Sequence, residues 1–465
     1  MNCLLTADYI CISDVDLFGI RVRLSAISYS FREARKRMER NILTGSLGVC
    51  AASIILAGAV QASEAWIRQD VLIGQYDVSV ANETRTVYPG CALGEPYAFH
   101  FKSGKNDKLL VYFNGGGACW NSNTCVGSLY TLDPVYVPSV EVANDPSVMG
   151  GILDVDNPEN PYADWSMPFV SYCTGDVHSG SNVTTYESPH GDSFPINHRG
   201  FDNFLFAMDW LKNNHPEINP GKILAAGSSA GSYGAALNYP WVREFYPDAD
   251  KVSLVGDGGV GVLQGTYEFP NAVFSEYSVW NIDDTLHPLL ASVPEVAIDD
   301  PALFIPQVYN RLRAEYPKDK FAQYTTAYDA VQIFFWDIML NPNPDSLHPW
   351  GAGLADPAFI REWSANMREL DGGLQYADLP DNYRSYIGAG CNHTILRFDD
   401  DFYTSSLSTD PEEVISFIQW LVGMTGGKDG DNSDWQSLSC IPGNCGEQDL
   451  TPIGINACLS RTFRD

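Results

Sequence analysis

The sequence has few basic residues: 28 lysines and arginines stand against 58 aspartates and glutamates among 465 residues, a formal net charge of -30. Nucleic acids and anionic membrane surfaces both require a basic face, so this acidity excludes the first as a partner and disfavours the second. Charged residues make up only 18% of the chain and hydrophobic residues 45%. The chain can therefore bury a full core and does not belong to the disordered class.

After residue 65 the sequence lacks any apolar run long enough to cross a bilayer. Residues 1–65 are different, because a basic stretch from Arg32 to Arg40 precedes an apolar run from Ile42 to Val60 and small residues follow. This pattern predicts a signal peptide, with Met38 as an alternative start of translation and a single membrane anchor as the alternative interpretation. Residues 66–465 are then predicted to form one secreted or periplasmic domain.

The sequence also lacks the closely spaced cysteine and histidine sets of a zinc site, so we expect no metal. Residues 66–465 nevertheless contain an even number of cysteines, which in an exported chain predicts disulfide bonds. The count alone leaves their pairing open. The candidates are Cys91, Cys119, Cys125, Cys173, Cys391, Cys440, Cys445 and Cys458.

No internal repeat or interdomain linker is present, and strand-like segments alternate with helix-like ones. This alternation predicts an α/β fold with a mostly parallel central sheet flanked by helices. Residues 269–381, rich in proline, aspartate and aromatics, are predicted to form a helical cap or insertion. The predicted strands are Lys108–Phe113, Met167–Cys173, Lys222–Ala226, Lys251–Gly256 and Tyr383–Gly388, and the clearest helices are Phe201–Asn213 and Pro411–Gly423.

The sharpest motif is the pentapeptide GSSAG at residues 227–231, which fits G-x-S-x-G. It follows a predicted strand and precedes a predicted helix, the position where a tight turn lifts a serine hydroxyl above the sheet edge. Ser229 is therefore the candidate nucleophile, and the amide of Ala230 would face the carbonyl oxygen under attack. A plain glycine and serine turn is the alternative interpretation.

A second motif, Asn114-Gly115-Gly116-Gly117, follows the strand KLLVYF. Glycine loops at this place supply backbone amides to the oxyanion hole of esterases. No Lys-Ser/Thr pair follows the glycines, which argues against a phosphate-binding loop.

A serine triad of this kind takes its acid and then its histidine after the nucleophile in the chain. His287 and His348 lie in proline-flanked stretches, whereas His393 follows the predicted strand 383–388 and is the candidate base. Asp337, at the end of the apolar run VQIFFW, is the preferred acid, and Asp257 in VGDGG is the alternative.

Five stretches occur in order: LLVYFNGGGACWNSNTC, PFVSYCTGDVHSG, ILAAGSSAGSYGA, VQIFFWD and AGCNHTIL. Together they resemble the pectin acetylesterase and Notum carboxylesterase family, which implies an α/β-hydrolase-like fold. The resemblance implies a triad of Ser229, Asp337 and His393. It implies an oxyanion hole formed by Gly116, Gly117 and Ala230.

The same resemblance implies the disulfides Cys119–Cys125 and Cys91–Cys173, and two more among the remaining cysteines that tie the histidine loop to the tail. Trp120, Asp176 and His178 lie within the matching stretches and are candidates for substrate contact. For Asp176 and His178, a structural turn is the preferred interpretation and substrate contact the alternative.

The expected function is that of a serine carboxylic-ester hydrolase. It would remove an acyl group, in the simplest case acetyl, from a glycan or another O-acylated substrate, as a monomer and without a cofactor. Residues 66–465 carry a net charge of -31, which repels the polyanion pectin and favours a neutral glycan or a small ester. An acyltransferase or peptidase with the same triad, or a non-catalytic binding protein, are the alternatives.

Overall fold

The computed structural model describes residues 65–131, 134–140, 144–264, 268–344, 348–375, 378–410, 413–426 and 434–462. The predicted signal peptide lies outside the described residues and stays a prediction. Within the described ranges, no helix combines the length and the hydropathy needed to cross a membrane.

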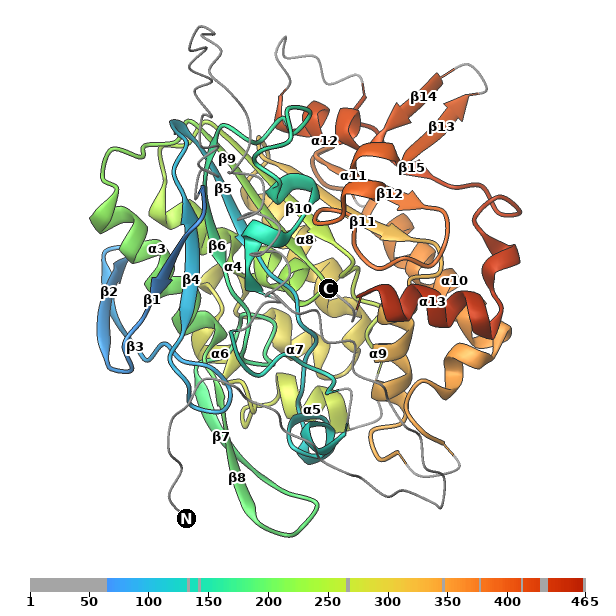
Figure 1. The fold of residues 1–465 in the computed structure, drawn as a ribbon, viewed down its shortest axis with the longest axis horizontal. Helices are drawn as coiled ribbons and strands as arrows, with labels where there is room; N and C mark the ends of the chain where they lie inside the picture. Colours follow the sequence, from blue (N-terminus) through green and yellow to red (C-terminus); the bar gives the residue numbers. More distant parts are fainter. Residues whose placement is uncertain are drawn as a thin grey trace, which may run out of the picture. The chain divides into compact units, whose positions relative to one another are not determined.

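A nine-stranded sheet forms the centre of the fold (Figure 1). Near one edge, β4 runs antiparallel to both of its neighbours, β1 and β6. Every strand pair from β6 to β15 is parallel. The prediction of an α/β-hydrolase-like fold is confirmed. In spatial order the strands are β1 (Ile67–Asp70), β4 (Ala98–Lys102), β6 (Trp165–Val170), β5 (Lys105–Phe113), β9 (Lys222–Ser228), β10 (Lys251–Asp257), β11 (Lys320–Thr326), β12 (Tyr383–Gly388) and β15 (Leu438–Ser439).

Helices cover both faces of the sheet, so the central strands are buried on both sides and read as continuous apolar runs. In β5, Leu109 and Val111 belong to one hydrophobic cluster, and Leu110 and Tyr112 belong to the other. The first cluster includes side chains of α3 (Gly200–Asn214), α4 (Ala230–Phe245), α8 (Phe304–Glu315) and α10 (Pro357–Gln375); the second includes α11 (Asp399–Thr404) and α12 (Phe417–Thr425).

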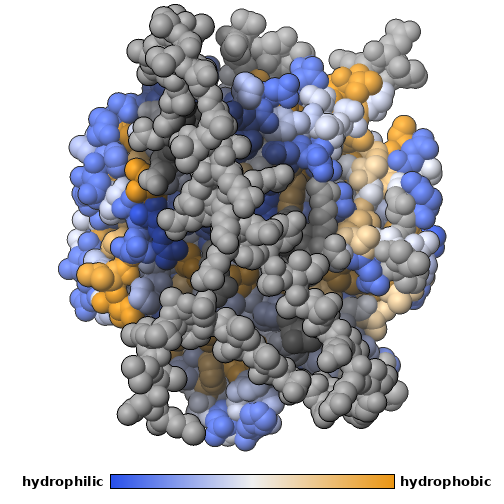
Figure 2. Space-filling model, in the orientation of Figure 1, coloured by the Kyte–Doolittle hydropathy of each residue, from blue (hydrophilic) through white to orange (hydrophobic). Residues whose placement is uncertain are grey.

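Smaller elements surround this frame. The hairpins pair β2 (Tyr76–Val80) with β3 (Glu83–Val87), β7 (Asn182–Glu187) with β8 (Ser193–His198), and β13 (Ser406–Asp410) with β14 (Glu413–Ser416). The short helices are α2 (Ser122–Cys125), α5 (Glu268–Phe274), α6 (Ile282–Thr285), α7 (Val293–Ala297), α9 (Ala330–Leu340) and α13 (Pro452–Thr462). On the face drawn in Figure 2, hydrophobic residues form small patches among hydrophilic ones.

Two sequence predictions need correction. The segment 269–381 is not a single helical insertion, because it contains β11, which pairs with β10 and β12 inside the main sheet. Residues 411–423 are not one helix either. Residues 413–416 form β14, and α12 begins only after Ser416, whose side chain accepts a hydrogen bond from the Gln419 amide in a capping box.

All eight cysteines after residue 65 are paired. The disulfides Cys91–Cys173 and Cys119–Cys125 agree with the pairing that the family resemblance implies. The pairs left open are Cys391–Cys458 and Cys440–Cys445, so the loop that carries His393 is tied to α13.

Candidate active site

Ser229 occupies the tight turn between β9 and α4. Its backbone has φ 58° and ψ -124°, a region that residues other than glycine rarely adopt. A Cβ on Gly227 would collide with the carbonyl oxygen of Gly231, and a Cβ on Gly231 would collide with that of Phe113. The G-x-S-x-G pattern is therefore a packing requirement, because strand, turn and helix approach too closely for larger residues.

The glycine loop after β5 lies directly against this turn. A Cβ on Gly115 would lie 2.6 Å from the carbonyl oxygen of Ser228 and 2.8 Å from Cβ of Ser229. Only glycine allows the loop to approach the serine this closely. The two motifs, far apart in the sequence, thus meet at the carboxyl ends of the neighbouring strands β5 and β9.

The amides predicted to form an oxyanion hole come from this loop and from the start of α4. Gly117 and Ala230 line the same pocket as Ser229, whereas Gly116 does not. The carbonyl of Gly117 accepts a hydrogen bond from the hydroxyl of Tyr172 at 2.8 Å, which fixes the orientation of the loop. Fixed amides beside a nucleophile suit the stabilisation of a developing oxyanion.

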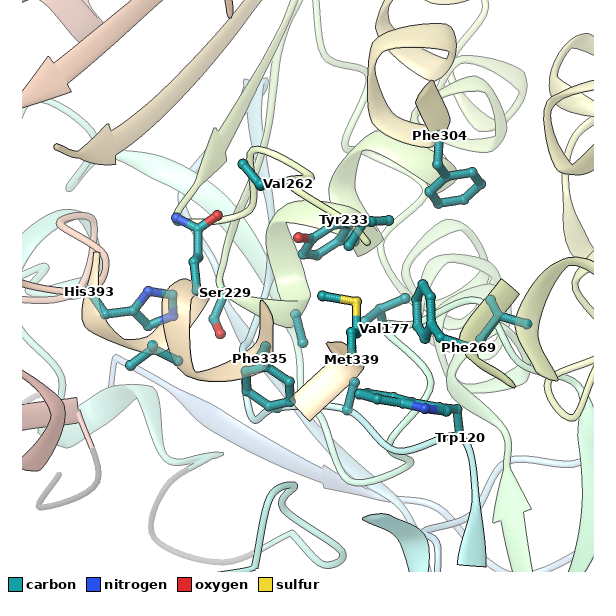
Figure 3. Close-up of a pocket in the computed structure, with 18 of the residues that line it drawn as sticks. Trp120, Val177, Ser229, Tyr233, Val262, Phe269, Phe304, Phe335, Met339 and His393 are labelled. Carbon is teal, nitrogen blue, oxygen red and sulfur yellow. The ribbon is translucent and has the colours of Figure 1, made fainter. Parts of the chain in front are cut away.

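His393 lies in the loop after β12, and its Nδ1 is 2.9 Å from both carboxylate oxygens of Asp329. The imidazole is 3% exposed and the carboxylate is fully buried. Because Nδ1–H donates to the carboxylate, the neutral ring presents Nε2 without a proton. That nitrogen is buried and has no hydrogen-bond partner among the described residues. His393 and Ser229 line one pocket (Figure 3), so Nε2 can accept a proton there.

Asp329 is also the N-cap of α9. Its Oδ1 accepts hydrogen bonds from the amides of Val331 at 3.1 Å and Gln332 at 3.0 Å, and its Oδ2 accepts one from Nε2 of Gln332 at 2.8 Å. The helix N-terminus favours negative charge at this position. These donors hold the carboxylate in one orientation toward the imidazole.

The prediction that Asp337 holds the imidazole is wrong. Asp337 lies farther along α9, where its Oδ2 accepts a hydrogen bond from the Gly351 amide at 2.7 Å. Burial raises the pKa of this carboxyl. Asp337 therefore stabilises the turn that follows α9 and does not contact His393.

The alternative acid, Asp257, is not paired with the imidazole either. Its carboxylate accepts hydrogen bonds from the amides of Ile395 and Leu396, each at 3.0 Å. An indication of Asp329 does exist in the sequence, because an aspartate just before an apolar helical run is a typical N-cap. The strand before it, KFAQYTT, is partly polar, so its sequence pattern does not mark it as a strand of the sheet.

An apolar pocket that opens to solvent extends from the nucleophile. In Figure 3, His393 and Ser229 lie at one end, while Trp120, Phe269 and Phe304 lie toward the other. Trp120, a predicted substrate contact, is thus part of the wall. The other apolar side chains that line the pocket are Val177, Val262, Leu263, Val273, Phe274, Trp280, Val331, Phe335, Met339 and Trp363.

Asp176 and His178, the other predicted substrate contacts, do not reach the pocket, because both are completely buried behind the glycine loop. Asp176 accepts hydrogen bonds from the amides of His178 and Gly200, and burial raises its pKa to about 6. Nε2 of His178 donates to the carbonyl of Asn114 at 2.8 Å, and burial lowers the pKa of this imidazole to about 4. Both residues support the loop from behind.

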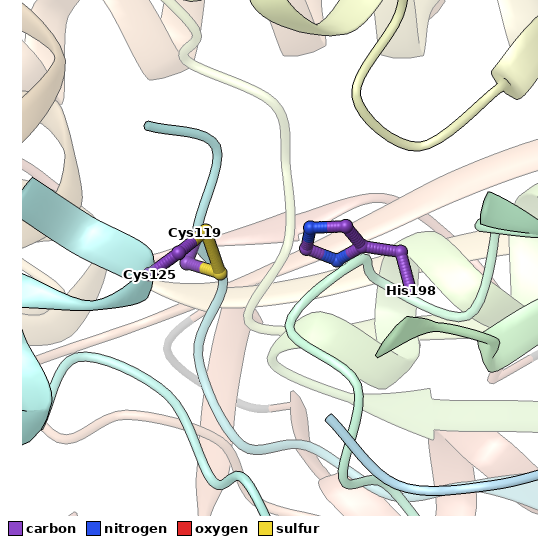
Figure 4. Close-up of side chains that lie close together, drawn as sticks. All are labelled: Cys119, Cys125 and His198. Atoms are coloured by element: carbon purple, nitrogen blue, oxygen red, sulfur yellow. A yellow bond between two sulfur atoms is a disulfide. The ribbon is translucent and has the colours of Figure 1, made fainter. Parts of the chain in front are cut away.

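One group of metal-binding side chain types, Cys119, Cys125 and His198, has its ligand atoms within 4.8 Å of one another (Figure 4). The two sulfurs are bonded to each other. The imidazole donates from Nδ1 to the carbonyl of Thr174 and accepts the hydroxyl of Tyr186 at Nε2, both at 2.9 Å. Every candidate ligand atom is therefore engaged within the protein.

Comparisons with known proteins identify the family of the chain. A family model described as Pectinacetylesterase matches residues 77–335, more than half of the chain, a range that includes Ser229 and Asp329. A palmitoleoyl-protein carboxylesterase NOTUM from Schmidtea mediterranea is 30% identical over 132 residues, which are 28% of this chain and 23% of that protein. The protein of the same name from Mus musculus is 29% identical over 179 residues, 36% of this chain and 33% of that protein.

Pectin acetylesterase 4 from Arabidopsis thaliana is 26% identical over 168 residues, 35% of this chain and 38% of that protein. The matched stretch thus spans less than two fifths of each of these relatives. A solved structure described as the Wnt deacylase Notum from Drosophila is similar with a TM-score of 0.48 and 18% identity, over 71% of this chain and 87% of that one. The family match over most of the sheet decides the assignment: the chain belongs to the pectinacetylesterase family, whose named relatives are carboxylic ester hydrolases.

Proposed function

We propose that this protein is a serine carboxylesterase that removes an apolar acyl group from an O-acylated substrate. Ser229 is the nucleophile, His393 the general base and Asp329 the acid that orients the base. The environment of His393 carries the proposal. Its Nδ1 is held by the buried carboxylate of Asp329, and its Nε2 has no hydrogen-bond partner within the described part of the chain. His393 lines the same pocket as Ser229, so Nε2 is free to take the serine proton.

In the first half of the reaction the Ser229 hydroxyl attacks the ester carbonyl carbon and gives its proton to Nε2 of His393. Asp329 stabilises the imidazolium that forms. The amides of Gly117 and Ala230, which line the pocket with Ser229, are the proposed donors to the oxyanion, each worth about 3 kcal/mol in such sites. The intermediate then expels the alcohol, which takes the proton from the imidazolium, and an acyl-enzyme remains.

In the second half a water molecule replaces the alcohol. His393 takes a proton from the water, whose oxygen attacks the acyl carbonyl. Collapse of the second intermediate breaks the bond to Ser229 Oγ, returns the proton to the serine and releases the carboxylic acid. Every proton passes through His393, so the sequence needs no group beyond the substrate and water.

The character of the pocket supports an acyl group longer than acetyl. Aromatic and aliphatic side chains dominate its wall, while Gln332 and the Tyr233 hydroxyl are among the few polar groups. Each methylene moved from water into such a wall stabilises the complex by about 0.8 kcal/mol, a factor of about four. A neutral O-acylated glycan or small alcohol is the proposed remainder of the ester, because a strongly acidic protein repels polyanions.

Four disulfides support an exported protein that works in an oxidising compartment. An acyltransferase would follow the same first half and pass the acyl group to an alcohol in place of water. A non-catalytic binding protein would keep the pocket but would not need a serine that reacts.

Hydrolysis of p-nitrophenyl esters from acetate to octanoate, together with labelling by a fluorophosphonate probe, tests the proposal. We expect kcat/KM to rise from acetate toward the longer esters and the probe to label the protein. Ser229→Ala should lower turnover at least about a thousandfold and abolish labelling. Ser232→Ala is the matched control, since the buried Ser232 hydroxyl has no hydrogen-bond partner in the described part of the chain. Labelling of folded Ser229→Ala at the wild-type rate would refute the assignment.

A further inference from the structure

Asp257 is a buried carboxylate that takes no direct part in the proposed reaction. It ends β10 and lies opposite Ser228 of β9 and Tyr324 of β11 in the sheet. The side chain is completely buried, and burial raises the pKa of its carboxyl to about 6. A buried carboxylate destabilises a fold unless hydrogen bonds compensate for its lost hydration.

The main chain of Asp257 holds the nucleophile turn. Its carbonyl oxygen accepts a hydrogen bond from the Ser229 amide at 2.7 Å. The backbone of Ser229 has a positive φ of 58°, a conformation that persists only where the surrounding structure enforces it. The hydrogen bond to Asp257 at the end of β10 therefore helps to hold Ser229 in this conformation.

The side chain of Asp257 holds the loop of the base. Its oxygens accept hydrogen bonds from the amides of Ile395 and Leu396, at 3.0 Å each. Thr394, which separates His393 from these amides, has a φ of 63°, a rare conformation for a β-branched residue. The carboxylate therefore holds the chain directly after the strained Thr394, beginning two residues after His393.

The residue after Asp257 packs against the imidazole itself. A Cβ on Gly258 would lie 2.9 Å from Cε1 and 3.1 Å from Nδ1 of His393. The carboxylate is fixed in turn, because Oγ of Ser228 donates to it at 2.7 Å and accepts the hydroxyl of Tyr112 at 2.7 Å. The end of β10 thus contacts both the nucleophile turn and the loop of the base.

We propose that Asp257 is a positioning residue, which holds the Ser229 turn and the His393 loop in mutual register for proton transfer. This inference rests on the proposed function. Misplacement of reacting groups by about 1 Å can cost about a hundredfold in rate, whereas the side chain of Asp257 does not line the acyl pocket. Loss of the carboxylate should therefore lower kcat and leave KM almost unchanged.

Asp257→Asn is the test, because it keeps the size of the side chain while it turns one of the two accepting oxygens into a donor. We expect kcat for p-nitrophenyl butyrate and the rate of fluorophosphonate labelling to fall together by about a hundredfold, with KM within threefold of wild type. Asp202→Asn is the matched control. Asp202 is also buried and accepts a backbone amide, from Tyr88 at 3.0 Å, but it does not line the pocket. Its kcat should stay within twofold of wild type.

A folded Asp257→Asn protein with wild-type kcat would overturn the inference, and so would a rise in KM that accounts for the whole loss. If this variant does not fold, Ser228→Ala decides the question. That variant removes one donor to the carboxylate, so a lower kcat at unchanged KM supports the inference and an unchanged kcat overturns it. Failure of the proposed function is separate, because it would appear as undiminished labelling of Ser229→Ala.

Discussion

Asp329→Asn and Asp337→Asn form a matched pair that tests the geometry of the site. Both residues belong to one helical segment, Asp329 as the N-cap of α9 and Asp337 within it, and both are buried. Only Asp329 contacts His393, with both oxygens 2.9 Å from Nδ1. The same chemical change should therefore have very different consequences at the two positions.

In Asp329→Asn the amide oxygen should remain at the Oδ1 position, where the amides of Val331 and Gln332 donate to it. The new NH2 group would then face two donors, the Nδ1–H of His393 and Nε2 of Gln332. The one oxygen left to accept Nδ1–H already accepts two backbone amides, so its hold on the ring is weakened. The ring relieves the conflict by moving its proton to Nε2, where it can no longer take the proton of Ser229. In triads the corresponding change costs about 10⁴ in kcat, which equals about 5 kcal/mol of barrier.

In Asp337→Asn the amide oxygen can still accept the hydrogen bond from Gly351, so kcat should change less than about twofold. Stability should fall by about 1 kcal/mol as one charge-assisted hydrogen bond weakens. Turnover of p-nitrophenyl butyrate and urea unfolding measure both quantities. Wild-type turnover in folded Asp329→Asn, together with a hundredfold loss in Asp337→Asn, would refute the reasoning.

Three further perturbations test the pocket, the buried imidazoles and the disulfides. Val273→Phe fills part of the pocket wall and should lower the octanoate to acetate ratio of kcat/KM at least about tenfold; an unchanged ratio would place the acyl chain elsewhere. Burial lowers the pKa of His198 to about 4, so the native ring stays neutral while the unfolded chain takes up a proton below about pH 6.5. The contribution of His198 to the free energy of unfolding is therefore fully present above about pH 6.5 and is lost as the pH falls toward 4. This loss amounts to about 2 kcal/mol between pH 7 and pH 5. His198→Gln should lack this part of the loss in urea titrations at the two pH values, and equal losses would contradict the linkage. Cys391→Ser with Cys458→Ser opens a crosslink that spans 67 residues and should cost about 4 kcal/mol in unfolding free energy, with a lower kcat; unchanged values would show that the crosslink does not restrain the loop.

The parts of the fold that depend on local sequence could be predicted. The strand Lys108–Phe113 is apolar along its length because α helices cover both faces of the sheet, and it is found within β5. Ser229 and His393 could be chosen because each follows a recognisable strand, and parallel strands present their carboxyl ends at one edge.

The acid could not be chosen in this way, because its position depends on the strand that precedes it. In β11 the residues Gln323, Thr325 and Thr326 are polar although buried, so periodicity does not mark the strand. The apolar run 331–336 favours Asp337 at its end as the acid, whereas the run is helical and the carboxylate that contacts His393, Asp329, is the N-cap of that helix. The pairing of β11 with β10 and β12 fixes the position of Asp329, and this long-range pairing cannot be deduced from a single sequence.

The substrate contacts show the same limit. Asp176 and His178 lie in a turn with positive φ at Val177 and His178, and this turn directs both polar side chains inward. Val177, between them, lines the pocket. The structure thus supports the structural turn that the sequence analysis preferred for Asp176 and His178. It also places Val177 in the pocket wall, which could not be predicted because side-chain direction follows from backbone dihedral angles that composition does not reveal.

The bond between Cys391 and Cys458 joins the loop of His393 to α13 near the end of the described chain. The nucleophile turn and the glycine loop come earlier in the sequence, whereas this restraint on the His393 loop can form only once Cys458, 67 residues after Cys391, is present. Until that bond forms, the imidazole would be held by Asp329 and its loop by Asp257 without this crosslink. The activity that we propose should therefore rise when the two thiols are oxidised.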